Sequence, residues 1–300
     1  MKILKKIQII LIALCVLTAG CRHEPVDIDI NAKCAIVREE KSGKTLFEKN
    51  AEEKFPPAST AKIMTAVIAI EELSLDDEII PSSYVAKIEP TVAGLKPGVK
   101  YKLKDLLSAL LVKSGNDAAY VIAERISGKE GIFAGLMNAK AKEIGMKNTF
   151  FATASGLPTG KEDLQYTTAY DLSVLMRYAA QYEILLGMMS AKEKDIAGSD
   201  GENIYLKTHN RALFQSPDAP WGKTGYTKEA RRTFAGTDPS FEPKIVISVL
   251  QSEDLWSDIL TLKRRGLELY EERRRPFLSK FISSVFARTP DLIRGTKQSQ

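Results

Sequence analysis

The sequence predicts an α+β fold, in which a five-stranded antiparallel sheet is flanked by helices and carries an inserted helical subdomain. Runs typical of β-strands occur at 33–38, 44–49, 221–227, 231–237 and 244–250. Between the second and third of these runs lies a long block of helical periodicity, from 103 to about 187. Because strands and helices are segregated along the chain, we expect its two ends to complete one sheet around the helical insertion.

The connecting segments agree with this order of elements. Residues 39–43 have the composition of a hairpin turn, and two prolines interrupt the chain before an apolar, helix-compatible stretch at 59–73. Segments 81–102 and 148–163 are expected to be loops, because both contain Pro and Gly. Helices are expected at 118–126, 133–144, 171–180 and 254–272. We therefore assign 32–262 to one globular domain, with a helical subdomain at about 81–200 and a basic tail at 263–300.

The first 31 residues have the pattern of an export signal followed by a tether. Three lysines precede an apolar run at 9–17, which is too short for a membrane span of about 20 residues. Residues 17–21, Leu-Thr-Ala-Gly-Cys, resemble the lipobox of bacterial lipoproteins, in which the cysteine becomes the lipidated first residue. This predicts a signal peptide at 1–20, lipid on Cys21 and a polar tether at 21–31. The alternative is an ordinary signal peptide cleaved nearby, with Cys21 incidental.

Composition excludes several reaction classes. The chain of 300 residues is 44% hydrophobic and 27% charged, which is typical of a globular protein. It has two His and three Cys but neither a C-x-x-C nor an H-E-x-x-H pattern, so no metal site is predicted. A Ser-His-Asp triad would have to use His23 or His209. The formal charge of +5 is too mild to indicate nucleic-acid binding, and Cys34, among apolar neighbours, is expected to be buried and inert.

Three short motifs occur once each: Ser59-Thr60-Ala61-Lys62, Ser114-Gly115-Asn116 and Lys223-Thr224-Gly225. In the first, residues i and i+3 share a helix face, so Lys62 can reach the hydroxyl of Ser59. A serine hydroxyl needs an adjacent base, and a lysine serves as one only when it is neutral, a form that burial and nearby positive charge favour. Taken alone, this motif is more often a helix-capping Ser with an exposed Lys one turn later.

The second motif lies where one apolar helix ends and another begins. Gly115 permits a tight turn, from which the Ser114 hydroxyl can relay a proton and the Asn116 amide can hold a substrate carbonyl. Either residue can instead cap the following helix, and for an isolated motif this reading is favoured.

The third motif lies in a predicted strand whose edge can bind an extended peptide. Gly225 removes a side chain where that peptide must approach, and Lys223 and Thr224 suit an anionic group such as a terminal carboxylate. The backbone N–H groups of Tyr226 and Ser59 can form an oxyanion hole. The alternative is an ordinary strand with a solvated Lys and a Tyr that packs.

Together the three motifs resemble those of the penicillin-binding protein and serine β-lactamase superfamily. Further stretches resemble one branch, the low-molecular-mass D-alanyl-D-alanine carboxypeptidases. They are 56–59, 114–119, 137–141, 148–150, 155–158 and 222–227. The resemblance spans roughly residues 30 to 252 and implies a β-lactamase/transpeptidase-like fold for the globular domain.

The resemblance implies a role for each motif residue. Ser59 matches the acylated nucleophile, Lys62 the general base and Ser114 the proton relay. The matching substrate-binding positions are Asn116, Lys223, Thr224, Gly225 and Tyr226. The implied reaction releases the last D-alanine of a peptidoglycan pentapeptide through an acyl-enzyme, with no metal or organic cofactor. Peptidoglycan stem peptides and β-lactam antibiotics are the implied partners, met outside the cytoplasm.

The sequence also departs from this family. After the third motif the family usually has Ala-Gly and a small apolar strand, whereas this chain has Ala230-Arg231-Arg232, which is expected to alter the cleft or the sheet edge. Ser155 stands where many members have His. About 25 residues separate Leu250 from Pro276, so the β-rich domain of many relatives is expected to be missing.

The end of the chain is basic, with ten Lys or Arg against four Asp or Glu in residues 261–300. Apolar residues at 277, 278, 281, 282, 285 and 286 predict one stripe of an amphipathic helix at 277–288. Such a helix can lie on an anionic membrane, and the alternative is packing on the protein's own core.

Other functions stay open at this point. A D,D-endopeptidase would cut peptidoglycan crosslinks with the same residues. A β-lactamase is disfavoured, because the chain has no Glu-x-x-Leu-Asn segment. A non-catalytic wall-binding or β-lactam-sensing lipoprotein belongs to a different class, and a purely wall-binding role would have no need of Lys62.

Overall fold

The computed structural model describes residues 27–160, 165–238 and 244–274. The predicted signal peptide, Cys21 and the predicted amphipathic helix at 277–288 lie outside these ranges. Among the helices within them, none is both long and apolar enough to cross a membrane.

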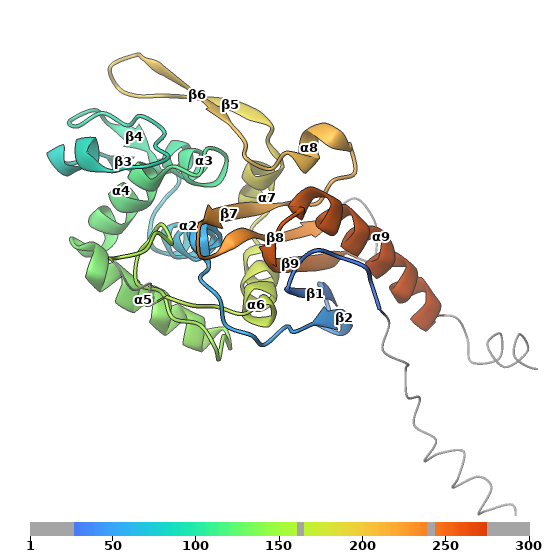
Figure 1. Cartoon of the computed structure of the whole chain (residues 1–300). Helices are drawn as coiled ribbons and strands as arrows, with labels where there is room; N and C mark the ends of the chain where they lie inside the picture. Colours follow the sequence, from blue (N-terminus) through green and yellow to red (C-terminus); the bar gives the residue numbers. More distant parts are fainter. Residues whose placement is uncertain (1–26, 161–164, 239–243, 275–300) are drawn as a thin grey trace, which may run out of the picture.

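A five-stranded antiparallel sheet joins the two ends of the globular domain, as predicted (Figure 1). Its order is β2-β1-β9-β8-β7. The strands are β1 (Cys34–Glu39), β2 (Thr45–Lys49), β7 (Trp221–Thr227), β8 (Arg231–Asp238) and β9 (Ile245–Ser252). The join between the early and late strands is the pairing of β1 with β9, where Ile36 lies opposite Ser248. All five predicted strands are confirmed to within two residues.

Both faces of the sheet are buried, and the alternation of side chains along each strand explains how. In β1, Cys34 and Ile36 face one apolar cluster while Ala35 and Val37 face the other. The first cluster contains α2 (Lys62–Glu72) and α6 (Ala169–Ala179), and the second contains α9 (Leu255–Arg274). The central strands β1 and β9 therefore carry apolar side chains on both faces, as expected for a sheet covered on two sides.

The helical subdomain includes elements that lie before its expected start at about residue 81, because it is built around α2, which is buried over most of its length. Its further elements are η1 (Ala58–Ala61), η2 (Ser83–Lys87), α3 (Leu103–Leu111), α4 (Asn116–Ser127), α5 (Glu130–Glu143) and α7 (Glu183–Ser190). The buried carboxylate of Asp117 at the start of α4 accepts the backbone N–H groups of Ala93, Gly94 and Leu95. This holds the 91–95 segment against the turn between α3 and α4.

Two hairpins were not predicted. Strands β3 (Glu78–Ile79) and β4 (Tyr101–Lys102) pair within and beside the expected loop at 81–102, and β5 (Glu193–Ala197) pairs with β6 (Asn203–Lys207) beyond α7. Each strand of the second hairpin buries one apolar residue, Ile196 or Leu206. One buried position per strand gives too little alternation to be recognised in a sequence.

Helix α9 crosses the boundary that we expected at 262/263. Leu262 and Leu269 are both buried on the sheet, and Lys263 pairs with the buried carboxylate of Asp238 at 3.1 Å. The first part of the expected tail therefore belongs to the globular domain.

A smaller expectation also agrees with the structure. Cys34 is fully buried, and burial, followed by the nearby Glu53, raises the pKa of its thiol to about 11, so the reactive thiolate is disfavoured.

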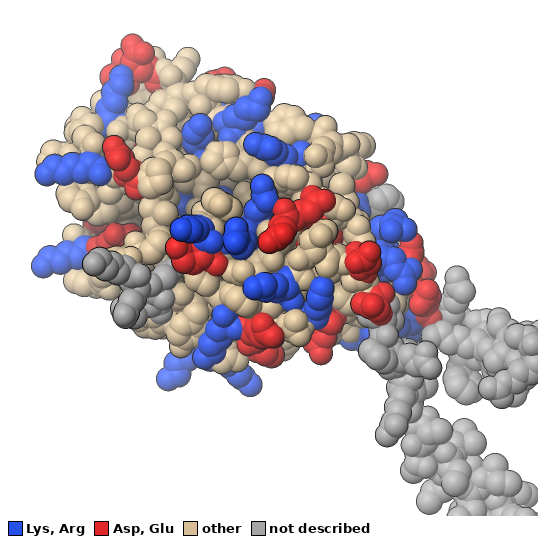
Figure 2. All heavy atoms as spheres, viewed as in Figure 1, with Lys and Arg blue, Asp and Glu red and all other residues tan. Residues whose placement is uncertain are grey.

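On the face of the molecule shown in Figure 2, basic and acidic side chains are interspersed.

Candidate active site

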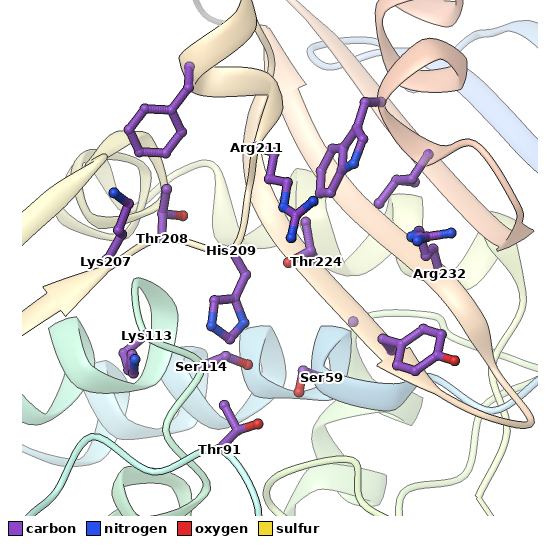
Figure 3. A pocket seen from close by; sticks show the side chains of 15 residues that line it. Ser59, Thr91, Lys113, Ser114, Lys207, Thr208, His209, Arg211, Thr224 and Arg232 are labelled. Carbon is purple, nitrogen blue, oxygen red and sulfur yellow. The ribbon is translucent and has the colours of Figure 1, made fainter.

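The three motifs meet at a cleft of about 660 Å³ between the helical subdomain and strand β7 (Figure 3). Ser59, Ser114, Thr224, Gly225 and Tyr226 line this cleft. The other three predicted residues lie behind its wall, with exposed fractions of 0% for Lys62, 4% for Asn116 and 1% for Lys223. The fold therefore brings all eight residues to one place, at two depths.

Ser59 lies in η1, directly before α2. In so short a helix the first backbone N–H groups have no partner within the helix, so they can serve a ligand. The neighbouring Ala58 has a φ of +47°, and Gly156, with a φ of +79°, packs directly beneath it. A Cβ atom at Gly156 would lie 1.8 Å from the carbonyl oxygen of Ala58, so only glycine lets the 155–157 loop approach η1 this closely.

Lys62 is held by three oxygen atoms. Its Nζ lies 2.8 Å from Ser59 Oγ, 2.7 Å from Asn116 Oδ1 and 2.8 Å from the carbonyl oxygen of Ser155. The last two oxygens can only accept hydrogen bonds. When Lys62 is a neutral amine, these two oxygen atoms accept its two N–H groups. Its lone pair then points at the hydroxyl of Ser59. The geometry that sequence spacing predicted for Ser59 and Lys62 is therefore present and is made directional by two further residues.

The electrostatic surroundings favour the neutral amine. Burial, followed by repulsion from Lys223, holds the pKa of Lys62 well below its usual range, against the opposing effects of Asp117 and Glu130. Burial also lowers the pKa of Lys223 to about 7. The charge of Lys223 thus disfavours the charged form of Lys62.

Asn116 has a part that the sequence did not predict. Its Nδ2 donates to the carbonyl oxygen of Pro90, while its Oδ1 accepts from Lys62. Asn116 therefore orients the amine of Lys62. An amide NH2 has two N–H groups, and the substrate contact expected from the sequence, which needs the second one, stays a prediction.

Ser114 and Thr224 present their side chains to the cleft, as predicted. Ser114 adopts a φ of +64° in the turn between α3 and α4.

Lys223 differs from the expectation: its Nζ donates to the carbonyl oxygen of Thr224 at 2.7 Å, and it does not line the cleft.

Strand β7 lies directly against η1. A Cβ atom at Gly225 would lie 2.8 Å from the backbone nitrogen of Ser59 and 3.0 Å from Ala58 Cβ. In the described part of the chain β7 pairs with β8 alone, so its other edge faces the cleft. This closeness suits an oxyanion hole made by the N–H groups of Ser59 and Tyr226.

Sequence reasoning missed part of the lining. The residues concerned are Thr91, Lys113, Lys207, Thr208, Arg211, Phe214, Leu255 and Trp256. His209, one of the two histidines considered for a triad, also lines the cleft. Burial and the nearby Lys223, Lys113, Lys62 and Arg211 lower its pKa to about 4, so it is uncharged at neutral pH. The basic run at 207–211 was the one local signal for these residues.

Comparison with known proteins identifies the class of the fold and the site. The sequence model of the D-alanyl-D-alanine carboxypeptidase family matches residues 20–253. A crystal structure of a D-alanyl-D-alanine carboxypeptidase from Mycobacterium tuberculosis superposes with a TM-score of 0.77 at 31% identity, covering 82% of this chain and 95% of that one. The chain belongs to the D-alanyl-D-alanine carboxypeptidase family.

Individual relatives show how far the similarity extends. The carboxypeptidase DacF of Bacillus subtilis is 35% identical over 67% of this chain but only 52% of DacF, so the chain spans about half of that relative. The carboxypeptidase DacB2 of Mycobacterium tuberculosis is 34% identical over 73% of this chain and 74% of DacB2. A D-alanyl-D-alanine endopeptidase of Pseudomonas aeruginosa is 29% identical over 69% of this chain and 66% of its own length.

The contact between β7 and η1 yields a prediction. Gly225→Ala places a methyl group against the backbone nitrogen of Ser59, so the strand and the nucleophile must move apart. Even a small misplacement of reacting groups costs about 100-fold in rate. We therefore expect the second-order rate constant for acylation by penicillin to fall by about 100-fold. Stopped-flow fluorescence with a labelled penicillin measures it.

Gly135→Ala is the matched control. Gly135 lies in α5, and nothing lies within 4 Å of a Cβ atom built there. This substitution should leave acylation unchanged and raise the free energy of unfolding by about 0.5 to 1 kcal/mol. Equal acylation rates in the wild type and Gly225→Ala would contradict the close approach.

Proposed function

We propose that the protein is a serine D,D-carboxypeptidase that releases the terminal D-alanine of peptidoglycan pentapeptides. The contact set of Lys62 is the observation that carries this proposal. A buried amine whose lone pair is directed at a serine hydroxyl has no structural purpose, because the burial of an amine costs free energy that an apolar side chain would not. Action as a general base gives this amine a purpose.

In the first half of the reaction, Ser59 Oγ attacks the carbonyl carbon of the penultimate D-alanine and its proton passes to Lys62 Nζ. The oxygen of the tetrahedral intermediate accepts hydrogen bonds from the N–H groups of Ser59 and Tyr226. The C–N bond then breaks, and Lys62 passes the proton that it took up to the leaving amine through the hydroxyl of Ser114, so that Lys62 is neutral again. The product is an ester on Ser59 and free D-alanine.

In the second half, water attacks the ester carbonyl and gives its proton to Lys62. The C–O bond to Ser59 breaks, and Ser59 Oγ recovers the proton from Lys62. A β-lactam enters the same first half, but the opened ring keeps its leaving amine attached to the acyl group. We therefore infer that β-lactams form a long-lived ester at Ser59.

Thr224 and Lys223 bind the carboxylate of the terminal D-alanine in this proposal. The hydroxyl of Thr224 lies at the cleft surface, and the charge of Lys223 lies directly behind it. A carboxylate near Lys223 stabilises its charged form, so substrate binding itself keeps Lys223 protonated.

We also infer that the protein acts outside the cytoplasm, held at a membrane by lipid on Cys21. The lipobox-like sequence at 17–21 and a substrate that lies in the cell wall support this. The basic segment at 277–288 is a second candidate anchor, and one lipid chain with a basic patch binds membranes more stably than either alone.

The Ser59→Ala variant tests the mechanism. We expect no covalent adduct with labelled penicillin, and D-alanine release from a pentapeptide at least about 10³-fold slower than in the wild type, because the nucleophile is removed. Peptide mapping of the wild-type adduct should locate the label on Ser59. A label at another residue would overturn the assignment.

The Lys223→Gln variant tests the electrostatics of Lys62. Acylation needs neutral Lys62, so its rate rises as pH increases through the pKa of Lys62. The positive charge of Lys223 lowers that pKa, and its removal raises it. We therefore expect the rising limb of the acylation rate at saturating penicillin to move to higher pH in Lys223→Gln.

Lys207→Gln is the control, because it removes a charge from the cleft surface and should leave the rising limb in place. A limb that stays in place in both variants would contradict the effect of the Lys223 charge on the pKa of Lys62.

The Cys21→Ser variant tests the anchor. Palmitate labelling should be lost, and the protein should leave the membrane fraction, more completely when residues 277–288 are also deleted. Cys34→Ala, a change at the buried cysteine, should keep both the label and the membrane fraction. Full membrane retention of the doubly altered protein would refute both anchors.

A further inference from the structure

The carbonyl oxygen of Ser155 is one of the two acceptors that direct the lone pair of Lys62, and its position depends on the residue before it. Ala154 is fully buried, and both polar atoms of its backbone are hydrogen-bonded to side chains. Its carbonyl oxygen accepts the hydroxyl of Thr65 at 2.6 Å, and its N–H donates to Oε1 of Glu130 at 3.1 Å. The segment that reaches Lys62 is therefore held from two sides.

The two side chains that hold Ala154 belong to different helices. Thr65 lies in α2, three residues after Lys62, on the helix that carries the amine itself. Glu130 is the first residue of α5, where the unpaired N–H groups of a helix favour a negative charge. The hydrogen bond to Glu130 thus fixes the 155–157 loop to a helix other than the one that carries Lys62.

The carboxylate of Glu130 lies in surroundings that do not favour its charge. It is half-buried, and burial raises its pKa, against the opposing effects of the Ala154 N–H and of Lys62. Among the described residues it forms no ion pair, and the N–H of Ala154 is its one hydrogen-bond partner. A carboxylate that loses water without gaining an ion pair costs free energy, so stability alone does not explain it.

Residue 155 acts through its backbone. Its carbonyl oxygen accepts from Lys62, while its hydroxyl accepts the N–H of Leu157 at 3.2 Å and so stays within the loop. A serine in place of the histidine of many family members therefore keeps the acceptor for Lys62. What this acceptor requires is that the neighbouring contacts hold the loop in place.

We propose that Glu130 is a positioning residue for the general base: through the N–H of Ala154 it keeps the carbonyl oxygen of Ser155 on Lys62 Nζ. This rests on the proposed function and deepens it, because it adds a residue that lies outside the three motifs and does not line the cleft. Without this hydrogen bond the loop loses its tie to α5. An amine that loses one of its two acceptors rotates more freely, and its lone pair is directed less well at Ser59.

The charge of Glu130 has a second effect on the same amine. The charged side chains that influence Lys62 come from three elements: Lys223 of β7, Asp117 of α4 and Glu130 of α5. Lys223 lowers the pKa of Lys62, whereas Asp117 and Glu130 raise it. His209, which Lys62 also influences, is uncharged at neutral pH. Glu130 therefore limits how far the pKa of the base falls, and a base with a higher pKa accepts a proton more readily.

Two substitutions separate these effects. Glu130→Ala removes both the acceptor and the charge, and we expect the acylation rate at saturating penicillin to fall by about 10-fold or more, as for a lost hydrogen bond to a charged group. The penicillin concentration at half-saturation should stay unchanged, because Glu130 does not line the cleft. Glu130→Gln keeps an oxygen atom for the N–H of Ala154 and should restore the saturating rate at high pH.

The pH dependence of Glu130→Gln supplies a readout that a merely structural role would not change. Removal of the negative charge lowers the pKa of Lys62. Because the acylation rate rises as Lys62 becomes neutral, the rising limb should move to lower pH. This shift is opposite to the one expected for Lys223→Gln.

Glu143→Gln is the matched control. It removes a carboxylate from the other end of α5, where Glu143 pairs with Lys140 at 2.9 Å, and it should change neither the rate nor the limb. Glu130→Asp takes the place of Glu130→Ala if that variant is unfolded in a thermal melt. It keeps the charge but withdraws the carboxylate by one methylene group, so it should acylate more slowly than the wild type.

The outcomes distinguish this proposal from the proposed function. A rate of Glu130→Ala or Glu130→Asp equal to that of the wild type, or an unmoved limb in Glu130→Gln, would overturn the role of Glu130 and leave the proposed function intact. A wild type that neither forms a penicillin adduct at Ser59 nor releases D-alanine would overturn the proposed function itself.

Discussion

The buried amine of Lys62 is the constraint on which the rest of the site depends. An amine removed from water must either be neutral or have a partner for every N–H group, since an unpaired buried charge costs several kcal/mol. Its partners come from three separate places: η1, the start of α4 and the 155–157 loop. The helical subdomain has to hold these three segments together around one nitrogen atom, and α2, packed at its centre, carries that nitrogen at its first residue.

The sheet contributes to the same site from its edge. Strand β7 reaches η1 only because Gly225 has no side chain, and this brings the buried charge of Lys223 near Lys62. Antiparallel pairing with β8 then sets which side chains follow along the cleft. Tyr226 lies opposite Arg232, and Thr227 lies opposite Arg231. The position of β7 and its register with β8 thus decide how close Ser59 lies to the strand and which of the two arginines lines the cleft.

The cleft contains basic groups in two different states. Lys62 and Lys223 are buried, and burial lowers the pKa of each, which suits proton transfer and a charge that depends on the ligand. Arg211 and Arg232 are exposed at the surface, where a guanidinium keeps its charge and its donors. The cleft thus combines two buried amines whose charge is disfavoured with two guanidinium groups at its surface.

The sequence by itself determined the features that depend on near neighbours. Short runs of strand-forming residues, such as those of β1 and β9, indicated the sheet, and the i, i+3 spacing placed Lys62 beside Ser59, because both patterns are set by the local geometry of the backbone. The tertiary structure alone decided the rest. It joined the Asn116 amide to Lys62 and Pro90, buried Lys223 with its Nζ on the carbonyl oxygen of Thr224, separated Arg231 from Arg232 and extended α9 through the expected domain boundary. Each of these depends on contacts between residues far apart in the chain, which packing and strand register establish and for which a local pattern carries no signal.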